Sequence, residues 1–277
     1  MKTKLFDYIE RDNFIYGLSG ITKLVCFVLL TLGAMLSYDA RSIFVIFLLS
    51  VVLLKVSEIP FRQVRLMFVY VAIFMAAEFV LTYLFAPQYG ESIYGTAHEI
   101  FRFSSRYVVT QEQMLYQFTK VLKYFSVVPL GIIFLLTTNP SELASALNRA
   151  GISYKGAYAL ALTLRYFPDT IRNYQDISLA QQSRGLDLSG KEKFSVRVKN
   201  IMSICVPLIF TTMDRIDLIS NAMDLRGFGK HKKRTWYAAR RLGRSDYTAM
   251  LFALLVFLGT VLVSIFINHS RFWNPFA

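Results

Sequence analysis

The sequence predicts an all-α integral membrane protein with about five transmembrane helices and a cytoplasmic helical domain that contains two long amphipathic helices. Three observations carry this prediction. The 277-residue chain has a mean hydropathy of +0.42, is 55% hydrophobic and is only 18% charged, whereas soluble domains are about 45–50% apolar and about 25% charged. Its apolar residues gather in stretches long enough for membrane helices. Much of its net charge of +13 lies in one long segment between two such stretches.

Five apolar stretches are candidate membrane helices. A helix needs about 20 mostly apolar residues to cross the hydrocarbon core of a bilayer. Three stretches meet or approach this length, at residues 66–86, 114–138 and 247–267. Two shorter ones, at residues 21–38 and 42–56, can be completed by tilting, local thinning and snorkelling lysines. We therefore predict five membrane helices.

The positive charges predict the orientation of these helices, because lysine and arginine concentrate on the cytoplasmic side. Segment 139–246 carries 18 Lys and Arg against nine Asp and Glu. With the N-terminus inside, only four arginines fall outside: Arg41, Arg102, Arg106 and Arg271. We expect a multi-pass protein of the cell membrane with a cytoplasmic N-terminus. Residues 1–138 would hold four membrane helices, 139–246 the cytoplasmic domain, and 247–277 the last membrane helix.

The cytoplasmic segment begins with a helix signal at residues 139–142. Asn139 is a capping residue, Pro140 suits the first helical position, and Glu142 can reach back to the cap. An amphipathic helix is therefore expected over 140–150, with Gly151 as its stop.

Two further amphipathic helices are expected over 168–186 and 207–227, each with a proline at or near its start. The apolar run 157–167 before the first of them is too short to cross a bilayer, so it predicts a buried helix at the membrane edge.

Both of these helices end in the same form, any residue followed by Arg-Gly. The two endings are Ser183-Arg184-Gly185 and Leu225-Arg226-Gly227. A glycine after the last turn can adopt the left-handed conformation and stop the helix. The arginine before it lies where the helix dipole favours a cation, and its planar guanidinium suits a carboxylate on a partner. We interpret the two endings as paired contact points; the alternative is that Arg-Gly merely caps two helices.

These residues resemble the transmembrane coupling subunit (T component) of energy-coupling factor (ECF) transporters, the EcfT/CbiQ family. The resemblance covers most of the chain and is strongest over 137–229. It rests on LSGITKL at 18–24, TTNPSEL at 137–143, LRYFP at 164–168, AQQSRG at 180–185 and AMDLRGFG at 222–229. Ser183 stands where the family usually has alanine, and residues 19–22 replace the family's Asp-Pro-Arg pattern before the lysine.

The resemblance implies the coupling subunit of an ECF-type ABC importer for a vitamin or micronutrient. Its implied partners are two ABC-type ATPases, a substrate-binding membrane S component and the lipid bilayer. The helices 168–186 and 207–227 would be crossed coupling helices that carry ATP-driven motion to the S component. The implied ATPase contacts are Ser183, Arg184, Gly185, Leu225, Arg226 and Gly227.

We expect a non-catalytic subunit without cofactors, in which the partner ATPases bind the ATP. Neither Gly190-Lys191 nor Gly229-Lys230 is followed by the Ser or Thr of a P-loop. The two cysteines and three histidines predict neither a metal centre nor a catalytic site. The basic residues before the last helix are interpreted as an anchor to anionic headgroups rather than as a nucleic-acid site. The alternatives are a permease subunit of a conventional ABC transporter and a membrane-bound hydrolase or transferase.

Glu78 lies within a predicted span, where an acidic residue is costly and is usually paired or functional. Lys120 and Lys123 enter a later span and are its candidate partners. Structural pairing, a contact to the substrate subunit and a proton relay stay open as interpretations. The loop 87–112 is expected outside, as either a re-entrant segment or a lid.

Overall fold

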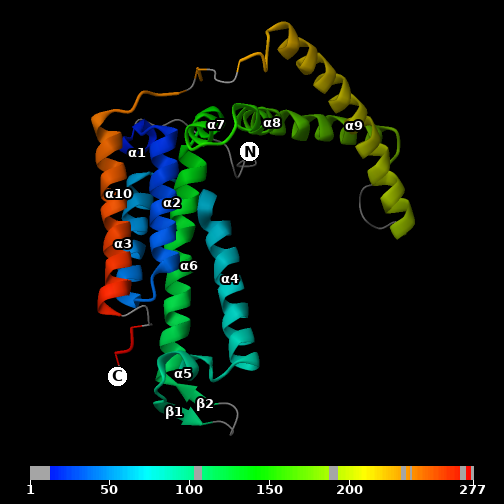
Figure 1. Cartoon of the computed structure of the whole chain (residues 1–277). Coiled ribbons are helices and arrows are strands. Elements are labelled where there is room, and N and C mark those ends of the chain that lie inside the picture. The colour runs from blue at the N-terminus through cyan, green and yellow to red at the C-terminus, as the bar shows by residue number, and fades with distance from the viewer. Residues whose placement is uncertain are drawn as a thin grey trace. The chain divides into compact units, whose positions relative to one another are not determined.

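The computed structural model describes residues 13–102, 108–186, 193–231, 235–237, 239–268 and 273–275. Arg106 and Arg271, two of the arginines expected outside the cell, are not among these described residues. The described part of the chain is helical apart from one two-stranded hairpin, so the predicted all-α fold is confirmed (Figure 1).

The chain folds into two compact units. The bundle unit is Met1–Asn139 with Arg240–Ala277, and the second unit is Pro140–Ala239. We call the second the α7–α9 unit, after its three helices: α7 (Pro140–Arg149), α8 (Tyr154–Ser183) and α9 (Phe194–Leu225).

Helices occupy all five of the stretches for which membrane helices are predicted. The bundle unit contains α1 (Phe14–Gly17), α2 (Gly20–Leu36), α3 (Ala40–Val56), α4 (Phe61–Phe85), α6 (Gln111–Thr137) and α10 (Arg244–Leu262), which a π-helical segment, η1 (Val263–Ile267), continues. Within the described residues, α4, α6 and α10 with η1 are long and apolar enough to cross a membrane, whereas α2 is apolar but shorter. The chain is therefore a membrane protein, and the number of spans stays a prediction.

The core of the bundle unit lies between α2, α3, α6 and α10, which run side by side in Figure 1. Its buried residues are Leu30, Ala34, Ile46, Leu130 and Ala253. Gly33 permits α2 to approach α10 closely, because a Cβ at this position would lie 3.1 Å from the Thr260 hydroxyl. By contrast, most of the apolar side chains of α4 are exposed, as expected for a surface that lipid or another membrane subunit covers.

The segment between α4 and α6 forms a short helix, α5 (Tyr89–Tyr94), and a hairpin of β1 (Glu99–Arg102) and β2 (Val108–Thr110). The fully buried Glu112 holds this segment to the start of α6. Its carboxylate accepts hydrogen bonds from His98 N at 3.0 Å and Thr96 Oγ1 at 3.0 Å. A short helix and a hairpin thus occupy the loop that the sequence analysis interpreted as either a re-entrant segment or a lid.

Glu78 is paired across the bundle, as one of the sequence interpretations expected. Its carboxylate binds the Lys120 ammonium and accepts a hydrogen bond from Thr82 Oγ1 at 2.7 Å. Lys123 was wrongly expected to be a partner. Its ammonium donates to Met35 O at 3.0 Å and lies 5.3 Å from the centre of the Tyr38 ring. Lys123 therefore binds the C-terminal turn of α2, where the helix dipole favours a cation.

A set of hydrogen bonds joins the N-terminal corner of the bundle unit to the end of α6 and to the segment before α10. The ammonium of Lys23 donates to Thr137 O at 2.7 Å and to Tyr16 O at 3.4 Å. Arg240 donates to the same Tyr16 carbonyl, also at 3.4 Å. This junction could not be predicted from the sequence, because the α6 acceptor of Lys23 lies 114 residues away in the chain.

Candidate functional site at two helix ends

Helix α7 begins at the predicted residue. Pro140 is the first residue of α7, and Arg149 is the last, one residue before the predicted end. Gly151 follows with φ = +108°, as its prediction as a helix stop requires. Ile152 N donates to Leu147 O at 3.0 Å, which closes this end of the helix.

The expected starts of the next two helices at proline are wrong. Pro168 lies inside α8 and Pro207 inside α9, and these helices are 30 and 32 residues long. The apolar run 157–167, expected as a separate helix, is part of α8. A proline inside a helix leaves the carbonyl four residues before it without its usual N–H partner. In α9 that carbonyl belongs to Ser203, and it accepts a hydrogen bond from Gln181 Nε2 of α8 at 3.4 Å.

Helices α8 and α9 cross and contact each other at several further points (Figure 1). Arg215 of α9 lies 4.0 Å from the Asp169 carboxylate of α8 and 6.0 Å from the centre of the Tyr166 ring. A largely apolar groove of about 430 Å³ runs along the crossing. It is lined by Leu162, Thr163, Tyr166, Phe167, Thr170, Thr212, Ile216, Ile219, Ser220 and Met223.

The first Arg-Gly ending forms the backbone motif that the sequence predicts. Helix α8 ends at Ser183, Arg184 is its C-cap residue, and Gly185 has φ = +90°. Leu186 N donates to Gln181 O at 3.1 Å, and Gly185 N donates to Gln182 O at 2.9 Å. This pair of bonds defines a Schellman motif.

The second ending repeats this geometry. Helix α9 ends at Leu225, Arg226 is the C-cap residue, and Gly227 has φ = +66°. Phe228 N donates to Met223 O and Gly227 N to Asp224 O, both at 2.9 Å. Each arginine is therefore held one residue past the last helical residue by the same pair of backbone bonds.

The predicted contact residues lie mostly on the surface of the unit. Arg184 and Arg226 are exposed, and Leu225 is 90% exposed although it is apolar. The Ser183 hydroxyl donates to Leu179 O at 3.0 Å within its own helix. Arg226 also lines a pocket of about 410 Å³ together with Arg165 of α8. The second ending thus brings two guanidinium groups to one pocket, where an anionic group would be favoured.

An aromatic cluster that the sequence analysis missed holds the second ending in place. The Phe228 ring lies 4.8 Å from that of Tyr158 and 5.4 Å from that of Tyr154. Trp236 packs on Tyr154 at 5.6 Å, and its Nε1 donates to Asn148 Oδ1 at 3.0 Å. The available signal was the spacing of Tyr154 and Tyr158, which puts both rings on one helix face.

Replacing Gly185 by alanine is expected to disrupt the first ending. A Cβ there would meet no atom within 4 Å, so the cost is the left-handed backbone itself, about 1–2 kcal/mol for a residue with a side chain. We expect faster amide hydrogen exchange at Leu186, whose N–H closes the motif. Asparagine tolerates this backbone conformation, so Gly185→Asn should retain more protection. Gly259→Ala in α10 is the control, because Gly259 has an ordinary helical backbone and open space around it; equal exchange in Gly185→Ala and wild type would contradict the prediction.

Within the described residues, no group of three or more His, Cys, Asp or Glu side chains is placed to hold a metal ion. Each of the two helix ends presents an exposed arginine, whose guanidinium suits binding of anions.

Comparison with known proteins places these features in a family. A family model described as cobalt transport protein, CbiQ, matches residues 12–237. The energy-coupling factor transporter transmembrane protein EcfT of Exiguobacterium sibiricum is 26% identical over 270 residues, which cover 92% of this chain and 96% of that protein. The EcfT protein of Bacillus selenitireducens is 25% identical over 269 residues, 94% of this chain and 96% of its own length.

A third relative is longer than this chain. The uncharacterized MG181 homolog of Mycoplasma pneumoniae is 27% identical over 170 residues, which span 58% of this chain and 39% of the Mycoplasma protein. The family match covers well over half of the 277 residues, and the two EcfT proteins align along nearly their whole length. The chain therefore belongs to the EcfT/CbiQ family of energy-coupling factor transporter transmembrane proteins.

Proposed function

We propose that this chain is the coupling subunit of an ECF-type ABC importer for a vitamin or micronutrient. Its bundle unit lies in the cell membrane, with the N-terminus and the α7–α9 unit in the cytoplasm. Two ABC-type ATPases bind the α7–α9 unit and hydrolyse ATP, and the chain itself is not an enzyme. Motion of the ATPases passes through α8 and α9 to a substrate-binding S component in the membrane.

The observation that carries the proposal is the pair of identical helix endings. Arg184 and Arg226 each follow a long helix, are exposed and are held by a Schellman motif. A guanidinium fork binds a carboxylate through two parallel hydrogen bonds, so each ending suits an acidic groove on a partner. Because the two endings have the same backbone geometry, they suit a partner that is present twice, as an ATPase pair is.

A separate surface of the same unit suits the S component. Helices α8 and α9 carry exposed large apolar side chains, among them Phe167 at 61%, Phe210 at 62% and Leu218 at 71%. With the groove along the crossing, they form an apolar surface of the kind that partner proteins or membranes cover. The coupling helices would then contact the ATPases at their ends and the S component along their length.

The proposal is tested by purifying the tagged full chain, in native lipid, from the cells that naturally produce it and its partners. We expect two nucleotide-binding subunits and one small membrane protein per copy of this chain, and ATP hydrolysis only in the complex. A conventional ABC permease would instead pair with a second permease subunit and line the substrate path itself. Two copies of this chain per ATPase pair, with no small membrane subunit, would refute the proposal in favour of that alternative.

A further inference from the structure

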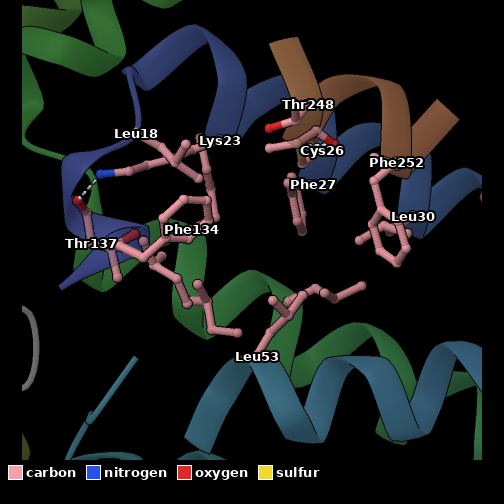
Figure 2. A pocket seen from close by; sticks show the side chains of 16 residues that line it. Leu18, Lys23, Cys26, Phe27, Leu30, Leu53, Phe134, Thr137, Thr248 and Phe252 are labelled. Atoms are coloured by element: carbon pink, nitrogen blue, oxygen red, sulfur yellow. Dashed lines mark hydrogen bonds between the residues drawn. The ribbon is translucent and has the colours of Figure 1, made fainter. Parts of the chain in front are cut away.

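The bundle unit contains an apolar cavity of about 380 Å³, which is unrelated to the two helix endings. Figure 2 shows the side chains of α2, α6 and α10 that surround it, with Leu53 of α3. Its lining is hydrocarbon apart from a few groups such as the Cys26 thiol and the Thr137 and Thr248 hydroxyls. Ligand cavities commonly have about 300–1,000 Å³, so the volume is large enough for a ligand.

One end of the cavity is polar, and the other is lined by apolar side chains. The Thr137 hydroxyl lies at the polar end, is fully buried, and has no hydrogen-bond partner among the residues that the structure describes. Burial of an unpaired hydroxyl is costly unless a ligand or water completes it. From Lys23 at this end to Leu30 at the far end, the lining follows α2 for seven residues, about 10 Å at 1.5 Å per residue.

Positive charge surrounds the polar end. Arg244 lies one helical turn before the lining residue Thr248 on α10 and is exposed. Arg240 and Arg241 precede it, and the Lys23 ammonium is bound to Thr137 O beside the cavity (Figure 2). An acidic group at this end, the Asp246 carboxylate, is buried and accepts hydrogen bonds from Ser19 N at 2.9 Å and Gly243 N at 2.8 Å. The outer surface of this end therefore favours an anion.

We propose that this cavity binds one acyl chain of an anionic phospholipid from the surrounding bilayer. The chain would extend toward Leu30 and Leu53, its ester carbonyl would accept a hydrogen bond from the Thr137 hydroxyl, and the phosphate would lie by Arg244. An α-helix is about 10–12 Å wide with its side chains, so a cavity of this size admits a linear chain and no helix of a partner protein. Because the cavity opens within a membrane bundle, lipid is the molecule at hand to fill it.

Photolabelling tests the proposal on the full-length protein in nanodiscs. Phosphatidylglycerol with a diazirine at the end of one acyl chain is the probe, and phosphatidylcholine with the same chain is the comparison. We expect mass spectrometry to find phosphatidylglycerol label on cavity residues such as Phe27 and Leu30, and less label from phosphatidylcholine. Label confined to the outer surface of the bundle, or equal labelling of the cavity by both lipids, would overturn the assignment.

Variants assign the label to the cavity. Ala249→Phe adds bulk to the lining and should remove the label from Phe27 and Leu30. Gly259→Phe adds comparable bulk to the same helix outside the cavity lining, at an exposed position where a Cβ meets no atom within 4 Å, and should leave the label in place. Thr137→Val keeps the shape but removes the hydroxyl, so it should weaken labelling even if Ala249→Phe does not fold. Unchanged cavity labelling in Thr137→Val and in any folded Ala249→Phe protein would contradict the proposal.

Discussion

Replacing both Arg184 and Arg226 by glutamate is expected to abolish retention of the ATPases and transport-coupled ATP hydrolysis. Both arginines are exposed at the ends of their helices, and the backbone hydrogen bonds of the two Schellman motifs do not involve their side chains. Each one replaces a cation by an anion opposite a proposed acidic groove, and like charges at such a contact cost several kcal/mol. Each single variant should reduce retention, and the double variant should eliminate it. Quantitative co-purification from solubilised membranes measures the result.

Arg172→Glu provides the matched control for this charge reversal. Arg172 lies in the middle of α8, its side chain is 65% exposed, and it is 3.8 Å from Asp169. Because Arg172 is 12 residues from Arg184 along α8 (184 minus 172) and does not line the pocket of Arg226, the control should retain the ATPases. All variants should insert into the membrane at wild-type levels. Wild-type uptake by the double variant would disprove the role assigned to the two arginines.

Removal of the Glu78 carboxylate is expected to destabilise the bundle unit strongly. Glu78 and Lys120 join α4 to α6, and their side chains are 24% and 23% exposed. Glu78→Gln leaves Lys120 as an unpaired charge within a membrane bundle, and breaking such a pair costs about 3–5 kcal/mol in buried sites. At about 2–4 °C per kcal/mol for a protein of this size, Tm should fall by roughly 10 °C. Thermal unfolding in one detergent measures the shift.

A double-mutant cycle separates the pair from its individual charges. Glu78→Gln with Lys120→Met removes both charges and should recover most of the lost stability, because neither charge is then left unpaired. Lys123→Met is the comparison, since Lys123 binds a carbonyl of α2 and leaves no carboxylate behind. Additive losses in the double variant would show that the pair makes no coupled contribution.

Local sequence rules predicted the parts of the structure that depend on neighbouring residues. Apolar length located the five bundle helices, and the Asn-Pro-x-Glu signal located the first residue of α7. The positive φ angles of Gly151, Gly185 and Gly227 were predictable because each glycine follows the last turn of an amphipathic helix, where glycine commonly adopts the left-handed conformation. The cost of an isolated charge in a membrane made pairing one of three interpretations of Glu78, and of the two candidate lysines the structure pairs it with Lys120.

Features that depend on distant residues were not predictable in this way. Proline favours helix starts, but Pro207 is tolerated inside α9. The carbonyl that it leaves without an N–H donor, Ser203 O, accepts a hydrogen bond from Gln181 on another helix. The packing of Phe228 against Tyr158 joins residues 70 positions apart (228 minus 158). The apolar cavity of the bundle unit likewise depends on how four helices and α1 meet, which no single stretch of sequence encodes.

The shared acceptor at Tyr16 has a topological consequence. The chain leaves the bundle unit after Asn139 and returns to it at Arg240, and both crossings lie beside groups that bind this one carbonyl. In effect, the α7–α9 unit is a domain inserted into a loop whose two sides already meet, an arrangement that host folds tolerate well. The Tyr16 side chain contributes to the same junction, because it is buried and its ring lies 5.8 Å from the Lys23 ammonium. The cations at positions 23 and 240 are what the closed loop requires.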